Sequence, residues 1–222
     1  MLVLGLETSC DETSCAVVRD GREVLSNIVA SQIEEHRLYG GVVPEIASRR
    51  HAESISQICA QAVNAAGITY SDVDAVAVTS APGLVGALIT GVSFAKGLAF
   101  SLGVPLIGVH HLRSHIAANY ITHPVLTPPF MALVVSGGHS HIIEVKSYTD
   151  YKIIGRTRDD AAGEAFDKVA RVLGFPYPGG AFLDKAADGG NKNNVPLPRP
   201  TVTGSEFDMS FSGLKTAVIN YL

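Results

Sequence analysis

Two histidines four residues apart carry the clearest chemical signal in this sequence. His111 and His115 lie in VHHLRSH, residues 109–115. On a helix, this spacing places both imidazoles on the same face, one turn apart. Two such imidazoles can supply two ligands to one metal ion. The alternative is a pair of ordinary surface or capping histidines, and the spacing by itself leaves both interpretations open.

A glycine pair after an apolar run is the second signal. Residues 133–139 read LVVSGGH, which predicts a strand that ends in a turn at Gly137 and Gly138. Backbone N–H groups in such a turn can approach an anionic ligand, because glycine has no side chain to hinder the approach. Together with the histidine pair, this turn suggests a metal ion and a phosphate-bearing ligand in one site.

Three further segments each have a functional and a structural interpretation. Residues 5–11 (GLETSCD) follow the first predicted strand, and their acids and hydroxyls suit a metal-bound water or a phosphate; a polar hairpin is the alternative. Residues 83–86 (GLVG) favour tight helix–sheet packing over anion binding. Asp160, Glu164 and Asp167 share one helical face, which is either a solvated acidic surface or part of a cleft.

The hydrophobic pattern predicts strands that alternate with helices, hence an α/β fold with a largely parallel sheet covered on both faces. We expect strands at residues 2–6, 15–19, 23–31, 73–79, 105–109, 130–136, 141–145 and 152–156. We expect helices at residues 46–66, 84–102, 112–120, 162–173, 182–187 and 211–222, and a loop at 35–44. A proline-rich hinge at 124–129 divides the chain into predicted domains at residues 1–124 and 125–222.

Composition narrows the possible classes of protein. The chain has 222 residues, of which 46% are hydrophobic and 17% charged, so a substantial core can form. The net charge of −4 argues against a broadly basic nucleic-acid-binding surface. An odd number of cysteines, at spacings that match no zinc module, indicates a reduced, cytoplasmic protein. No stretch reaches transmembrane length, so we expect no membrane association.

Seven segments, in the same order along the chain, resemble the TsaD family of bacterial tRNA-modification proteins, once labelled O-sialoglycoprotein endopeptidases. They cover essentially the whole sequence: ETSCDET (7–13), YGGVVPEIASRRH (39–51), APGLVGAL (81–88), VHHLRSH (109–115), LVVSGGHS (133–140), DDAAGEAFDKVARVLGFPYPGG (159–180) and MSFSGLK (209–215).

The resemblance implies an actin/Hsp70/sugar-kinase-like (ASKHA) fold, with two α/β lobes and a nucleotide cleft. It implies transfer of a threonylcarbamoyl group from threonylcarbamoyl-AMP to N6 of the adenosine 3′ of the anticodon, in tRNAs that read A-starting codons. The expected partners are tRNA, the actin-like paralogue TsaB and the P-loop ATPase TsaE.

The resemblance also implies roles for individual residues. His111 and His115 would bind one divalent metal ion, Fe²⁺ or Zn²⁺, and Asp11 would be the catalytic acid–base residue. The adenylate would be bound by Val134, Val135, Ser136, Gly137, Gly138, Asp167, Gly180 and Asp184. The family's further asparagine and aspartate ligand lie downstream of the SGLK motif and are absent here. We therefore expect a C-terminally truncated chain, with an incomplete second lobe and no transfer activity.

Two other classes of protein are weighed against this one. A zinc metalloprotease with an HExxH motif needs a glutamate directly after the first histidine, and Leu112 occupies that position. A non-catalytic actin-like scaffold would bind only a partner or a nucleotide. The presence of His111, His115, Asp11 and the SGGH turn argues against a scaffold for the parent protein.

Overall fold

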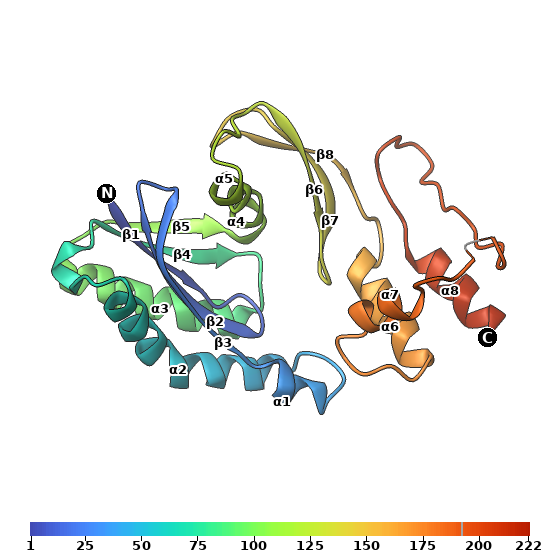
Figure 1. The fold of residues 1–222 in the computed structure, drawn as a ribbon, viewed down its shortest axis with the longest axis horizontal. Helices are drawn as coiled ribbons and strands as arrows, with labels where there is room; N and C mark the ends of the chain where they lie inside the picture. Colours follow the sequence, from blue (N-terminus) through green and yellow to red (C-terminus); the bar gives the residue numbers. More distant parts are fainter. Residues whose placement is uncertain (192) are drawn as a thin grey trace. The chain divides into compact units, whose positions relative to one another are not determined.

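The chain forms two compact units in a computed structural model that describes residues 1–191 and 193–222. The first unit is Met1–Leu126 and the second is Thr127–Leu222. Each contains its own sheet and its own helices (Figure 1). They are described in turn.

The first unit is built on a five-stranded mixed sheet. Its strands are β1 (Leu2–Glu7), β2 (Glu12–Arg19), β3 (Glu23–Ser31), β4 (Ala75–Ala81) and β5 (Leu106–His110), in the order β3-β2-β1-β4-β5. β1, β2 and β3 pair antiparallel, whereas β4 pairs parallel to both β1 and β5. The positive φ angles of Asp20 and Gly21 close the β2–β3 hairpin at the predicted turn. The expectation of a largely parallel sheet is wrong here, because short turns join the first three strands.

Two long helices cover one face of this sheet. α2 (Pro44–Ala65) and α3 (Val85–Leu102) lie side by side against it (Figure 1). Gly67 and Gly103 follow them with φ of +68°, the left-handed conformation expected after a helix. The predicted loop at 35–44 instead begins within a short helix, α1 (Ile33–Arg37), and η1 (Tyr70–Asp72) precedes β4. The predicted helix 112–120 is two helices, α4 (His111–Ala117) and α5 (Asn119–Thr122).

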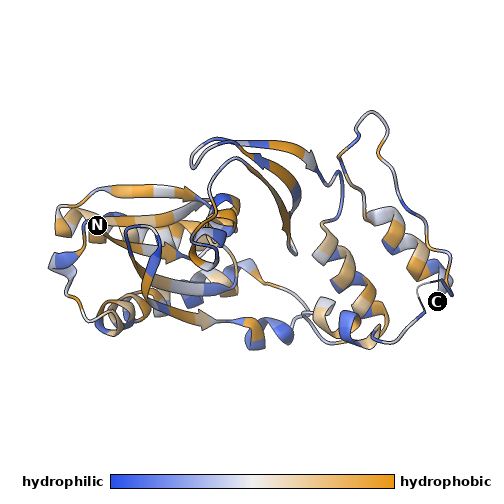
Figure 2. Ribbon diagram, turned by 45° about the horizontal axis from the view of Figure 1, so that its top comes forward, coloured by the Kyte–Doolittle hydropathy of each residue, from blue (hydrophilic) through white to orange (hydrophobic). Residues whose placement is uncertain are grey.

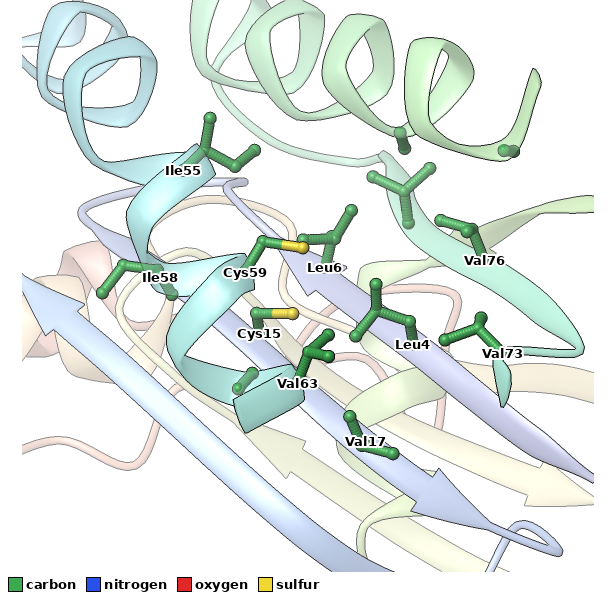
Figure 3. Close-up of a cluster of buried hydrophobic side chains, with 14 residues drawn as sticks. Leu4, Leu6, Cys15, Val17, Ile55, Ile58, Cys59, Val63, Val73 and Val76 are labelled. Atoms are coloured by element: carbon green, nitrogen blue, oxygen red, sulfur yellow. The ribbon is translucent and has the colours of Figure 1, made fainter. Parts of the chain in front are cut away.

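The core of the first unit lies between the sheet and these two helices. Figure 3 shows the side chains of β1 and β2 meeting those of α2 and of the segment that enters β4. Leu4 is fully buried, and the free thiols of Cys15 and Cys59 are buried in the same cluster. The fully or nearly fully buried members are Leu4, Leu6, Cys15, Val17, Ile55, Ile58, Cys59, Ala62, Val63, Val73, Val76, Val78, Ala95 and Ala99.

Helix α3 is apolar over most of its length, with a mean hydropathy of 1.5 across its 18 residues. Figure 2 colours the ribbon of the whole chain by hydropathy. By length and composition α3 could cross a membrane, so the expectation that no stretch reaches that length is wrong. Its buried side is made of small residues: Ala87, Gly91, Ala95 and Ala99. This side packs on α2 and β4, as the helix of a layered α/β domain does. Its other side exposes Val85, Ile89 and Phe100, the last at 90% of its surface.

The second unit is a three-stranded antiparallel sheet followed by helices. Its strands are β6 (Phe130–Val135), β7 (Ser140–Val145) and β8 (Tyr151–Arg156), in that order across the sheet. The helices are α6 (Ala162–Val172), α7 (Gly180–Ala186) and α8 (Ser212–Tyr221). The Asp159 carboxylate accepts hydrogen bonds from the backbone N–H groups of Phe211 and Ser212, and thereby caps α8 and ties it to the segment before α6.

Candidate functional site

The carboxyl ends of β1, β4 and β5 bring three polar residues together. The parallel register pairs Leu6 with Val78, so the next residues, Glu7 and Thr79, lie side by side. β5 ends at His110, and α4 begins at His111 immediately beyond it. Ligand sites of open α/β sheets lie at this end of parallel strands. The topology therefore explains why these side chains converge.

The two histidines of α4 point the same ring atom at one another. Their Nε2 atoms are 3.1 Å apart, and the rings meet edge to face with centroids 4.5 Å apart. The predicted helical spacing is therefore confirmed. Two nitrogens that each bind one metal ion at about 2.1 Å lie roughly 3.0–3.4 Å apart, so the pair fits a shared ion. Among residues 1–191 and 193–222, no group of three or more His, Cys, Asp or Glu residues is arranged to hold a metal ion.

Glu7 holds the first of these histidines from behind. Its Oε2 lies 3.1 Å from Nδ1 of His111 and accepts a 2.6 Å hydrogen bond from Thr79 Oγ1, while its Oε1 accepts the backbone N–H of Ser9. Burial raises the pKa of this carboxyl, but the hydrogen bonds from His111, Ser9 and Thr79 outweigh it and hold the pKa at about 2. The sequence interpretation named the segment 5–11 but chose Asp11 as its functional acid, and so missed Glu7.

The surroundings of His115 favour its uncharged form, which is the form that metal binding requires. Burial, together with the neighbouring His111, lowers the pKa of His115 below its ordinary value. A neutral imidazole keeps one nitrogen lone pair available. The electrostatics of the pair are therefore compatible with a ligand role.

A cavity of about 340 Å³ lies beside the histidine pair, entirely within the first unit. This volume suits a small ligand. Glu12, the first residue of β2, lines this cavity, whereas Asp11 in the preceding loop does not. The lining residues are Gly5, Leu6, Glu7, Glu12, Ala77, Val78, Thr79, Val109, His111, Ser114, His115 and Ala118.

The loop that carries Asp11 is fixed by a buried polar cluster. Nε2 of His51 donates to the Cys10 carbonyl at 3.0 Å, and Gln32 N donates to the Asp11 carbonyl at 2.9 Å. Nδ1 of His51 accepts the Thr13 hydroxyl at 2.8 Å. Behind it, His36 Nε2 donates to Gln32 Oε1 at 3.1 Å, and both histidines are fully buried. The peptide group before Asp11 and the one after it are therefore each held by a hydrogen bond.

In the second unit, the predicted glycine turn is present and is backed by α6. Ser136 N donates to the His139 carbonyl at 2.8 Å, and Gly163 N donates to the Ser136 carbonyl at 3.1 Å. A Cβ added to Gly163 would lie 2.8 Å from Gly137 N, so only glycine fits against the turn. Gly137 and Gly138 are exposed, and of the two preceding residues Val134 is buried and Val135 exposed.

The acidic residues around α6 have separate partners. Asp167 Oδ1 accepts the backbone N–H groups of Gly179 and Gly180 at 2.8 and 3.0 Å, which brings two predicted site residues together. Asp160 and Glu164 instead form ion pairs with Lys168 at 2.9 and 2.7 Å. The structure therefore divides the predicted acidic face into an ion-pair group and a turn-holding aspartate. Asp184 is exposed on α7.

The glycines of residues 83–86 serve packing, as the sequence favoured. A Cβ on Gly83 would lie 2.7 Å from the Ser9 carbonyl oxygen, and one on Gly86 would overlap the Ser48 side chain. Leu84 N also donates to the Ser9 carbonyl at 2.8 Å. This segment therefore supports the loop after β1.

Comparison with known proteins gives a consistent picture. A family model described as "TsaD: tRNA N6-adenosine threonylcarbamoyltransferase" matches residues 23–222. A protein of that description from Clostridioides difficile strain 630 is 53% identical over 222 residues, which is 100% of this chain and 66% of the relative. One from Clostridium perfringens strain SM101 is 56% identical over 221 residues, again 100% of this chain and 65% of the relative. The chain thus spans just under two thirds of the length of these relatives.

A solved structure shows the same fold. Component A of (R)-2-hydroxyglutaryl-CoA dehydratase from Acidaminococcus fermentans aligns with a TM-score of 0.53 at 15% identity, over 99% of this chain and 67% of that one. Likeness at such low identity bears on the fold alone. The predicted α/β fold of the ASKHA class is confirmed.

Proposed function

Since the chain belongs to the TsaD family of tRNA N6-adenosine threonylcarbamoyltransferases, we propose that the protein transfers threonylcarbamoyl from threonylcarbamoyl-AMP to N6 of the adenosine 3′ of the tRNA anticodon. The observation that carries this proposal is the His111–His115 pair, with Nε2 atoms 3.1 Å apart at the carboxyl end of β5. The two units would correspond to the two lobes of the ASKHA fold.

The histidine pair would hold one divalent ion, Fe²⁺ or Zn²⁺. Such an ion supplies positive charge that stabilises a developing oxyanion and the leaving phosphate. Because the pair offers two ligands, its hold on an ion would be weak in this chain. The lowered pKa of His115 and the convergent Nε2 atoms support the assignment.

The adenylate would be bound by groups of the second unit. We assign this role to Val134, Val135, Ser136, Gly137, Gly138, Asp167, Gly180 and Asp184. The exposed glycine turn offers backbone N–H groups to a phosphate, and the fit of Gly163 against it supports a fixed turn. Asp167 would act partly by holding Gly179 and Gly180 in place.

Asp11 would accept the proton of the attacking amine. The exocyclic amine of adenine is a poor nucleophile, so removal of its proton in the transition state lowers the barrier. The acyl adenylate is already activated, and the remaining task of the protein is to position the carbonyl near the amine. The hydrogen bonds that hold the Cys10 and Asp11 carbonyls support a fixed place for this carboxylate.

The expected partners are tRNA, TsaB and TsaE. A net charge of −4 supports a need for other proteins to attract tRNA. The exposed apolar side of α3, with Val85, Ile89 and Phe100, is a suitable surface for the actin-like paralogue. Replacement of Ile89 by Asp is expected to weaken that association.

The test is a transfer assay with the protein extended to the length of its relatives. Unmodified tRNA and threonylcarbamoyl-AMP are supplied with the two partner proteins, and the modified nucleoside is measured by mass spectrometry. Asp11→Asn is expected to lower turnover about 100-fold or more with adenylate affinity unchanged. His111→Ala is expected to remove metal and most activity. Absence of the modified nucleoside with the unaltered protein would refute the proposal.

The same protein preparation also tests the alternative that the protein is a peptidase. Leu112, in the position of the metalloprotease glutamate, is buried and carries no base. We expect no peptide cleavage with added Zn²⁺. Cleavage that depends on His111 would favour the peptidase.

A further inference from the structure

We propose that Glu7 is a positioning residue, whose carboxylate fixes His111 in the tautomer that leaves Nε2 bare and aimed at a metal ion. This inference rests on the metal site proposed above. The residue stands at the end of β1, 104 positions before the histidine in the sequence. Neither the spacing of the histidines nor the family comparison assigns it a role.

The tautomer follows from what each atom can donate. An ionised carboxylate only accepts hydrogen bonds, so the 3.1 Å contact between Glu7 Oε2 and His111 Nδ1 requires the hydrogen to be on Nδ1. A neutral imidazole carries one such hydrogen, and its other nitrogen then has a free lone pair. That other nitrogen is Nε2, the atom that faces Nε2 of His115. The contact therefore selects the form of His111 that a metal ion needs.

Glu7 is itself rigidly held, which makes the contact specific. Thr79 Oγ1 donates to the same Oε2 at 2.6 Å, and the backbone N–H of Ser9 donates to Oε1. The β1–β4 register pairs Leu6 with Val78, so the sheet itself places Thr79 beside Glu7. The Ser9 hydroxyl also lies 3.1 Å from Nδ1 and can share its hydrogen. Orientation of metal-binding histidines by a carboxylate on the other ring nitrogen is a general feature of such sites.

A glutamine cannot replace this arrangement. An amide has one accepting oxygen and one donating nitrogen. If its oxygen takes the place of Oε2, its nitrogen meets the Ser9 N–H; if the amide is flipped, its nitrogen meets Thr79 and His111. The first orientation sets the amide nitrogen against the Ser9 N–H, and the second suits the opposite tautomer of His111, because the Thr79 hydroxyl and a bare Nδ1 can both accept from that nitrogen. Glu7→Gln therefore no longer fixes the hydrogen of His111 on Nδ1, although the side chain keeps nearly the same size.

The experiment first determines the tautomer of His111 and then measures the affinity for Zn²⁺. Imidazole ¹⁵N chemical shifts are recorded for the metal-free 222-residue chain, which gives the protonated nitrogen of His111 directly. We expect hydrogen on Nδ1 in the unaltered chain and a shift toward Nε2 in Glu7→Gln. Calorimetric titration with Zn²⁺ should then show affinity about 10- to 100-fold lower in the variant.

Two matched variants separate position from charge. Glu23→Gln removes the same charge from an exposed ion pair with Arg19, and it should change neither the tautomer nor Zn²⁺ affinity. Glu7→Asp keeps the charge but withdraws the carboxylate by one methylene, and it should behave like Glu7→Gln. If Glu7→Asp instead matches the unaltered chain, charge and not position is responsible, and the proposal is wrong.

The unaltered chain alone also decides the matter, whether or not the variants fold. Hydrogen on Nε2 of its metal-free His111 would overturn the proposal. Failure of the unaltered chain to bind Zn²⁺ would refute the metal site proposed above, and the ¹⁵N shifts would still test the link between Glu7 and His111.

Discussion

The two sheets begin in the same way and then diverge. In the first unit β1, β2 and β3 form an antiparallel meander, and in the second β6, β7 and β8 do the same. In the first sheet β4 adds parallel to the outer side of β1, and β5 to β4. In the second, β6 remains at the end of the strand order, within the part of the chain that the structure describes.

This difference determines where polar groups gather. Carboxyl ends of three parallel strands meet in the first sheet, and Glu7, Thr79 and His111 come from those three ends. The second sheet has no such edge among its described strands, and its predicted site groups come from a turn and from the residues around α6. The parallel strands β4 and β5 that extend the first sheet therefore create a site lined by side chains. The second sheet, which has three antiparallel strands, offers mainly backbone groups.

Matched leucines test how far the two sheets differ. Leu4 of β1 is fully buried, whereas Leu133 of β6 is 66% exposed. Leu4→Ala should lower the free energy of unfolding of the first unit by about 2–5 kcal/mol, because it removes packed methyl groups. Leu133→Ala should change stability by less than about 0.5 kcal/mol. Urea unfolding, monitored by the amide NMR signals of each unit, measures both changes in stability. Equal effects of the two substitutions would contradict the difference between the two sheets.

The position of β6 at the edge of the described three-stranded sheet should also make the chain associate with itself. Met131, Leu133 and Val135 are exposed apolar residues on an edge strand, a combination that favours pairing between molecules. Leu133→Lys should shift the 222-residue chain toward monomer in light scattering. The control is Val29→Lys on β3, an exposed position on the edge of the first sheet. A chain that is already monomeric, or equal effects of the two lysines, would contradict this prediction.

The helix cap of the second unit should have a smaller effect. Partial burial raises the pKa of Asp159, but hydrogen bonds from Ser210, Phe211 and Ser212 outweigh it and hold the pKa at about 2, below its ordinary value of 3.8. Its contribution to stability is therefore present above pH 3.8 and is lost as the pH falls toward 2. Asp159→Ala should cost about 1 kcal/mol near neutral pH. Asp188→Ala, at an exposed acid after α7, is the control, and unfolding curves that do not separate the two would disprove the cap.

The smallest effect is expected from His51 in the first unit. Burial is the main reason that its pKa lies below 6.5, although the bond to the Cys10 carbonyl opposes this shift. A depressed folded-state pKa means that the stabilisation is complete above pH 6.5 and declines as the pH falls through the folded-state value. The slope from this one proton is at most about 1.4 kcal/mol per pH unit. Urea midpoints below pH 6.5 should fall more steeply with falling pH in the unaltered chain than in His51→Gln, which keeps the slope from His115.

The features that the sequence predicted are local ones. The turn at Asp20 and Gly21, the helix ends at Gly67 and Gly103, and the shared face of His111 and His115 depend on residues within a few positions of each other. The approximate positions of strands and helices could be predicted for the same reason, because the hydrophobic pattern is also local.

The features that were missed depend on distant residues. Glu7 meets His111 only because β4 and β5 add beside β1, and no local pattern specifies that addition. The mixture of parallel and antiparallel pairs was missed for the same reason. Asp167 finds its partners 12 and 13 residues away, across a turn whose path the sequence does not specify.

The placement of the three cysteines gives the first unit its own reporter of opening. Cys10, Cys15 and Cys59 are all in Met1–Leu126, and Cys15 and Cys59 are buried in its core. A thiol-specific reagent reaches those two sulfurs only when that core opens, so the rate of alkylation measures how often the first unit unfolds. The second unit contributes no thiol among residues 127–222. Labelling followed by mass spectrometry therefore times the opening of one half of the protein without interference from the other.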